Sequence, residues 1–242
     1  MNRIKLGNYA HISISVLDLQ ESSRFYELLG FKVLYGNNEP HPWALFTDGS
    51  VNIHLYQFSF VSPALHYFSN HMQDKVLELM RLGIRPGQQT SKDGHRVQST
   101  IADPSEFLIM LMHHNDAEMP KPDGDLRCRL GTFGELSINT ENLGSSVDFW
   151  QQFDFTILNR GEKPYPWAIL SDGAMTVGFH QTSSFTTPAL TYYATDVHER
   201  VQLLKYDSFR NLRELKDASG TTEGAVLQAP EGQLLFILKG RA

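Results

Sequence analysis

Ten residues at positions 40–49 read PHPWALFTDG, and the ten at positions 164–173 read PYPWAILSDG. The two segments are identical at six of these ten positions, and Trp43 and Trp167 stand 124 positions apart. Because unrelated segments rarely match so well, the pair indicates an internal repeat.

Other residues repeat at nearly the same offset, so the similarity is not confined to one motif. Phe25-Tyr26 corresponds to Phe149-Trp150. The repeat predicts two homologous halves, 7–115 and 131–240, with a linker at 116–130 between them. The linker is rich in Pro and Asp, as connecting segments commonly are.

Composition narrows the class of protein. The chain has 242 residues, enough for two cores, and 41% hydrophobic and 20% charged residues are typical of globular proteins. A net charge of −6 without charge blocks argues against nucleic-acid and membrane partners. Apolar runs are too short for a membrane helix. The single cysteine, Cys128, cannot form an intrachain disulfide, so we expect a cytoplasmic protein.

Each half contains two similar units. Residues 10–16 alternate apolar and polar side chains as a strand does, and Asp18 with Glu21 forms a capping-box pattern ahead of a helical apolar face. The strands expected next in the first unit are 31–34, 43–47 and 51–57. The second unit of the same half then has a short strand at 64, a helix ending at Gly83, and strands at 96–101 and 107–112. With helices at 142–152 and 196–205 in the second half, the pattern predicts four βαβββ units.

Four such units in two pairs resemble the vicinal-oxygen-chelate superfamily, which includes glyoxalase I, extradiol dioxygenases and bleomycin-binding proteins. The residues that carry the resemblance are 11–16, 22–31 and 102–109, although Glu106 stands where the family's turn usually has Gly. The resemblance implies an α+β fold. Four βαβββ modules would pair into two glyoxalase-like domains, each a curved mixed sheet around a cleft.

The resemblance also implies where a metal ion would bind. The family's ligand positions fall on His11, His54, His66 and Met110 in the first half. In the second half they fall on Glu135, Gly178, Thr191 and Phe236, which gives a degenerate site. Three imidazoles would hold one divalent ion (Zn, Ni, Fe or Mn). Met110 replaces the usual carboxylate, so the alternative of a site that has lost its metal stays open.

These positions imply a metal-dependent enzyme acting on a small substrate that chelates through adjacent oxygens. The missing carboxylate favours a lyase or isomerase over a ring-cleaving dioxygenase. Tyr56, Phe58 and Met110 would contact the substrate, and Glu106 or Glu135 would carry protons. The alternative is a metal-free small-molecule-binding protein. Pairing of modules within or across the repeat, and a monomer or a homodimer, are both compatible with the sequence.

Overall fold

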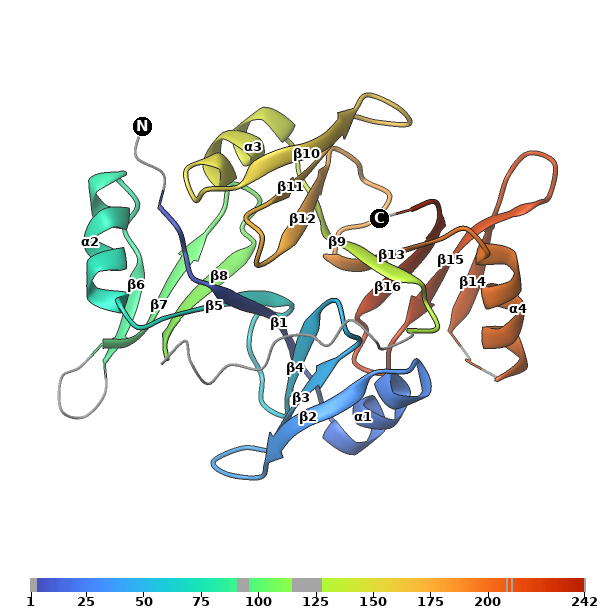
Figure 1. Cartoon of the computed structure of the whole chain (residues 1–242), viewed down its shortest axis with the longest axis horizontal. Helices are drawn as coiled ribbons and strands as arrows, with labels where there is room; N and C mark the ends of the chain where they lie inside the picture. The colour runs from blue at the N-terminus through green and yellow to red at the C-terminus, as the bar shows by residue number, and fades with distance from the viewer. Residues whose placement is uncertain (1–3, 91–95, 115–127, 208, 210, 242) are drawn as a thin grey trace. The chain divides into compact units, whose positions relative to one another are not determined.

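The computed structural model describes residues 4–90, 96–114, 128–207, 209 and 211–241. The helices are α1 (Leu19–Leu28), α2 (Met72–Arg81), α3 (Leu143–Gln151) and α4 (Val197–Tyr206) (Figure 1). The strands of the first half are β1 (Tyr9–Ser15), β2 (Lys32–Asn37), β3 (Trp43–Thr47), β4 (Asn52–Tyr56), β5 (Ala64–Ser69), β6 (Gly87–Thr90), β7 (Arg96–Ala102) and β8 (Leu108–His113). Those of the second half are β9 (Thr132–Asn139), β10 (Thr156–Gly161), β11 (Trp167–Ser171), β12 (Thr176–His180), β13 (Ala189–Ala194), β14 (Leu212–Lys216), β15 (Thr222–Gln228) and β16 (Leu234–Lys239).

The strands form two sheets with the same order. One sheet runs β2-β3-β4-β1-β5-β8-β7-β6, and the other runs β10-β11-β12-β9-β13-β16-β15-β14. Both sheets are mixed, because β5 pairs with β8 and β13 pairs with β16 in parallel, whereas β1–β5 and β9–β13 are antiparallel. The α+β fold with βαβββ units is therefore confirmed.

Local sequence explains most element boundaries. The Asp18 Oδ1 atom accepts hydrogen bonds from the backbone N–H groups of Gln20 (2.8 Å) and Glu21 (3.1 Å), which caps α1 as the sequence predicts. The helix is followed by Gly30, whose φ of 95° suits a residue without a Cβ atom. Strand β6 was not expected, because its polar segment has no alternation of apolar side chains.

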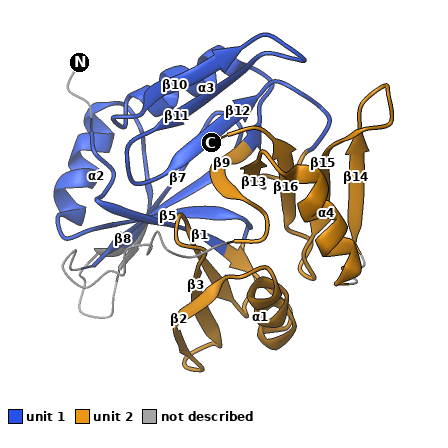
Figure 2. Ribbon diagram, turned by 45° about the vertical axis from the view of Figure 1, so that its right-hand side comes forward, with its two compact units in different colours: residues 1–13, 61–121, 138–185 blue, residues 14–60, 122–137, 186–242 orange. Residues whose placement is uncertain are grey.

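Contacts divide the described chain into two compact units, shown in Figure 2. Unit 1 comprises residues 1–13, 61–121 and 138–185, and unit 2 comprises residues 14–60, 122–137 and 186–242. Each unit therefore combines segments from both halves of the sequence. The expected linker at 116–130 lies mostly outside the described residues.

Unit 1 contains two hydrogen bonds from aromatic side chains to carboxylates, of which the first is buried and the second partly buried. Trp150 donates from Nε1 to Asp103 Oδ2 over 3.0 Å, and the Tyr67 hydroxyl donates to Asp172 Oδ2 over 2.7 Å. Burial raises the pKa of both carboxyl groups. Each bond joins the second module of the chain to the third.

Unit 2 contains a similar pair of bonds. The Tyr26 hydroxyl donates to Glu231 Oε1 over 2.6 Å, and the Tyr192 hydroxyl donates to Asp48 Oδ2 over 2.8 Å. Tyr26 corresponds to Trp150 of unit 1 in the repeat. These bonds join the first module to the fourth, so the repeat is visible in the contacts inside each unit.

In the part of the chain that the structure describes, no helix is long and apolar enough to cross a membrane.

Candidate functional site

Two of the predicted metal ligands face each other in unit 1. His11 on β1 lies directly opposite His66 on β5 in the antiparallel register, and their ring centroids are 5.2 Å apart with an interplanar angle of 38°. Both are buried, with 1% and 6% of their surfaces exposed. Phe68 packs against His11 with a centroid distance of 4.9 Å, which gives one side of the pair an apolar boundary.

The environment of His66 favours the neutral imidazole. Burial lowers the pKa of His66 to about 4, because the positive charge of a protonated ring is poorly stabilised away from water. At neutral pH the ring therefore has an unprotonated nitrogen. This is the form in which histidine binds metal ions.

Met110 lies next to this pair. It is opposite His66 in the parallel register of β5 and β8, so the three side chains occupy adjacent positions on β1, β5 and β8. Met110 is half-buried. Its thioether brings no charge and binds hard divalent ions weakly, so this row of side chains supplies two imidazoles without a carboxylate.

His54 lies on β4 in unit 2 and is packed between two aromatic rings. Its centroid is 4.7 Å from that of Trp43, and it stacks on Tyr56 at 3.9 Å with an angle of 25°. Tyr56 in turn contacts Phe58, whose centroid is 5.5 Å away and whose surface is 42% exposed. The two aromatic residues predicted to contact substrate thus lie in one aromatic cluster with His54.

Glu135, predicted as a proton carrier, is completely buried on β9 in unit 2. Its Oε1 accepts a hydrogen bond from the Ser137 hydroxyl over 2.6 Å, and the same hydroxyl lies 2.6 Å from Thr191 Oγ1. Thr191 is opposite Glu135 in the register of β9 and β13. The positions that correspond to His11 and His66 are therefore bridged by a serine in the second sheet.

Glu106, the other predicted proton carrier, lies in the turn before β8 and is exposed. Its φ is 63°, in the left-handed region, and its backbone N–H donates to the Asp103 carbonyl over 2.9 Å. The residue thus keeps the backbone conformation that Gly adopts easily, although it has a Cβ atom. The structure does not place Glu106 in the row formed by His11, His66 and Met110.

A metal site needs several donor atoms that converge on one point. An ion about 2.1 Å from a ring nitrogen lies about 3.2 Å from the ring centroid, so centroids 5.2 Å apart leave His11 and His66 close enough to share one ion. Within the described residues, no group of three or more His, Cys, Asp or Glu side chains gathers at one ion position.

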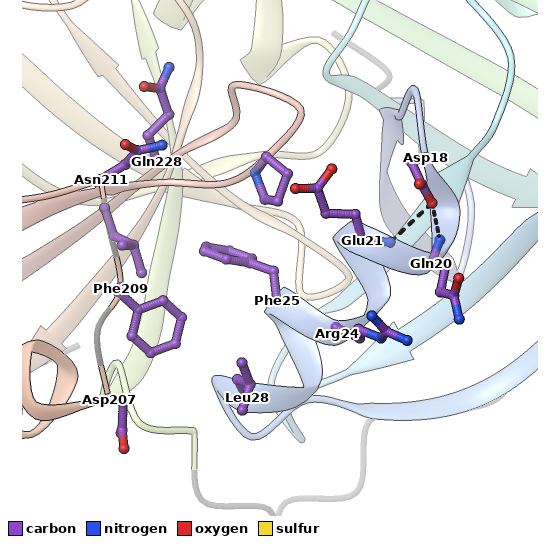
Figure 3. A pocket seen from close by; sticks show the side chains of 12 residues that line it. Asp18, Gln20, Glu21, Arg24, Phe25, Leu28, Asp207, Phe209, Asn211 and Gln228 are labelled. Carbon is purple, nitrogen blue, oxygen red and sulfur yellow. Dashed lines mark hydrogen bonds between the residues drawn. The ribbon is translucent and has the colours of Figure 1, made fainter.

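A pocket of about 360 Å³ lies elsewhere in unit 2, between α1 and the segment that follows α4 (Figure 3). Phe25 and Phe209 meet there at right angles with centroids 5.6 Å apart. The residues that line it are Asp18, Gln20, Glu21, Arg24, Phe25, Leu28, Asp207, Phe209, Asn211, Leu227, Gln228 and Pro230. None of the predicted site residues lines this pocket. Of its features, only the apolar face of helix α1 could be predicted from the sequence.

Comparison with known proteins gives structural matches alone. No protein-family model and no curated protein sequence matches the chain. Among solved structures, a catechol 2,3-dioxygenase matches with a TM-score of 0.63 and 14% identity over 99% of this chain and 89% of its own. The E323L mutant of homoprotocatechuate 2,3-dioxygenase from Brevibacterium fuscum matches with a TM-score of 0.66 and 13% identity over 98% and 72%.

The 2,3-dioxygenase LapB from Pseudomonas sp. KL28 also matches, with a TM-score of 0.63 and 12% identity over 96% of this chain and 91% of that one. The chain has the tandem fold of the extradiol dioxygenases. The fold implied by the sequence resemblance is therefore confirmed over nearly the whole length. Identities this low show the fold alone, because one fold hosts many activities.

Proposed function

We propose that the protein is a metal-dependent enzyme that acts on a small substrate with two adjacent oxygen atoms. The observation that supports this most strongly is the facing pair of buried imidazoles, His11 and His66, at two positions where the resemblance implies metal ligands. The resemblance also implies His54 as a ligand, but His54 belongs to unit 2, and the described residues contain no cluster of three such side chains. The ion would be Zn, Ni, Fe or Mn. Imidazole suits the first three, whereas Mn prefers harder oxygen donors.

The bound ion would act as a Lewis acid on the substrate oxygens. His11 and His66 would hold it, together with His54 if the ligand set that the resemblance implies is complete. Tyr56 and Phe58 would contact the apolar part of the substrate. Proton transfer falls to Glu106 or Glu135. Glu106 is exposed, so it can exchange a proton with solvent, whereas Glu135 is enclosed.

The reaction class follows from the missing carboxylate. A site of imidazoles and a thioether carries no negative charge of its own, which disfavours the iron chemistry that a 2-His-1-carboxylate face supports. We therefore favour lyase or isomerase chemistry over ring cleavage, although the solved neighbours named above are 2,3-dioxygenases. An activity screen should therefore test ring cleavage of a catechol beside lyase and isomerase reactions.

A second candidate function is a metal-free small-molecule-binding protein. It is favoured by Met110, which stands directly opposite His66 where a charged ligand would complete a metal site. In that case the aromatic cluster around Tyr56 would bind the small molecule without chemistry.

Metal content distinguishes the two functions. The protein is purified without a His-tag or added metal and analysed for Zn, Ni, Fe and Mn, before and after reconstitution. A His11→Ala/His66→Ala variant is compared with a His71→Ala/His198→Ala variant, which removes two exposed histidines instead. Near-stoichiometric metal that is lost only in the first variant supports the enzyme, and absence of metal from the reconstituted wild type contradicts it.

A further inference from the structure

Ser13 is a buried polar residue that the proposed site has not used. Its side chain has no exposed surface, and its hydroxyl has no hydrogen-bond partner among the described residues. A buried hydroxyl without a partner is unfavourable, because it has lost its hydrogen bonds to water. Such a group is expected to form a hydrogen bond with a water molecule, an ion or a ligand enclosed by the protein.

The position of Ser13 points to the histidine pair. It follows His11 by two residues on β1, so the two side chains lie on the same face of the strand. The residue opposite Ser13 is Ala64, just as His66 is opposite His11. Alanine has no polar side-chain atom, so it offers the serine hydroxyl no hydrogen-bond partner.

The second half of the chain provides an internal comparison. Ser137 corresponds to Ser13 in the repeat, and its hydroxyl bonds to both Glu135 and Thr191. Those two residues occupy the positions of His11 and His66. In the second sheet the serine is thus satisfied by protein atoms, and in the first sheet the equivalent protein atoms have been replaced by imidazoles.

We propose that the Ser13 hydroxyl donates a hydrogen bond to an oxygen of the ligand held at His11 and His66. This role rests on the proposed metal-dependent function. The oxygen belongs to a small chelating group enclosed together with Ser13, and the serine selects ligands that present an oxygen acceptor there. Ser13 is a ligand-binding residue and not a metal ligand.

The first test needs no ligand. The free energy of unfolding in urea is measured for the metal-free Ser13→Ala, Ser99→Ala and Ser137→Ala variants. Ser99 is the matched control, since its hydroxyl is also fully buried without a described partner but lies on a different strand, β7, opposite Leu111. We expect the first two variants to be at least as stable as wild type and Ser137→Ala to be less stable. A Ser13→Ala variant that is clearly less stable than Ser99→Ala means that Ser13 has a protein partner, which overturns the proposal.

The second test uses Co(II) and acetohydroxamate, a small chelator with two adjacent oxygens, followed by the visible spectrum of the bound ion. We expect Ser13→Ala to bind Co(II) like wild type but acetohydroxamate about tenfold more weakly, with Ser99→Ala unchanged. Equal acetohydroxamate affinity in wild type and Ser13→Ala overturns the role of Ser13 alone. Failure of wild type to bind Co(II) contradicts the proposed function, and the role of Ser13 with it.

Discussion

At the scale of single residues, two buried or partly buried bonds from aromatic donors to carboxylates join the modules inside each unit. Tyr26 and Tyr192 illustrate the energetics in unit 2. Each hydroxyl donates to a carboxylate with little access to water: Asp48 is buried and Glu231 is partly buried. Removing the donor leaves the acceptor without that bond, and this is the costly way to break a buried hydrogen bond.

We therefore expect Tyr26→Phe and Tyr192→Phe each to lower the free energy of unfolding by about 1–3 kcal/mol. Urea unfolding at pH 7 measures the change. Tyr206→Phe is the control, because Tyr206 is 87% exposed and should alter stability little. Equal stabilities for all three variants would show that the buried bonds contribute nothing.

The carboxyl group of Glu231 predicts a pH dependence. Burial raises its pKa, with the neighbouring Glu21 adding to the shift, so the native state binds the proton more tightly than the unfolded chain. Lowering the pH from 7 toward the ordinary value of 4.5 therefore increases the free energy of unfolding, and raising it again loses that gain.

Glu231→Gln lacks this titration. The difference in unfolding free energy, wild type minus variant, should increase as the pH falls from 7 to 5. Urea titrations of both proteins at the two pH values give the difference, and other titrating groups cancel. A difference that decreases on acidification is incompatible with a raised pKa.

The sequence allows some of the important residues to be predicted but not others. His11 and His66 could be singled out because the repeat and the resemblance fix their positions. Asp48 could be predicted only as a turn residue. Its bond to Tyr192 depends on how modules distant in the sequence pack together, and no local pattern encodes this.

At the scale of elements, the turn before β8 keeps a left-handed residue without glycine. Glu106 has a φ of 63°, where a Cβ atom costs about 1 kcal/mol. The turn is nevertheless maintained, because the Asp103 Oδ1 atom accepts bonds from the backbone N–H groups of Ser105 (2.8 Å) and Phe107 (2.9 Å).

Glu106→Gly should therefore raise the free energy of unfolding by about 0.5–1 kcal/mol, measured by urea unfolding. Glu106→Ala removes the same carboxylate but keeps the Cβ atom, so it should not stabilise. If alanine stabilises as much as glycine, the charge of Glu106 and not the backbone conformation is responsible.

Most helices and strands could be predicted because local rules determine them. The Asp18 cap and the apolar alternation of β1 are encoded within a few residues of each element. Strand β6 could not be predicted in this way, since a polar segment becomes a strand only through pairing with β7.

At the scale of the whole molecule, the repeat determines the architecture. Both sheets have the same strand order, and each compact unit contains modules from both halves. We propose that the halves 7–115 and 131–240 are the evolutionary domains. The sequence could establish two halves, but which modules share a compact unit depends on side-chain contacts such as that of Trp150 with Asp103.

Metal binding should stabilise the folded chain as a whole. An ion that binds the native site alone raises the free energy of unfolding by about 2.7 kcal/mol at a hundredfold excess over its Kd. Thermal unfolding with and without Zn(II) or Mn(II) should show this increase for wild type and for His71→Ala/His198→Ala. Stabilisation of His11→Ala/His66→Ala to the same extent would place the ion elsewhere.

The most direct test is an anomalous-scattering map from crystals of the protein loaded with Zn(II). The proposed function predicts one strong peak about 2.0–2.1 Å from a ring nitrogen of both His11 and His66. A peak at other residues, or no peak in fully loaded protein, would contradict the proposed metal centre.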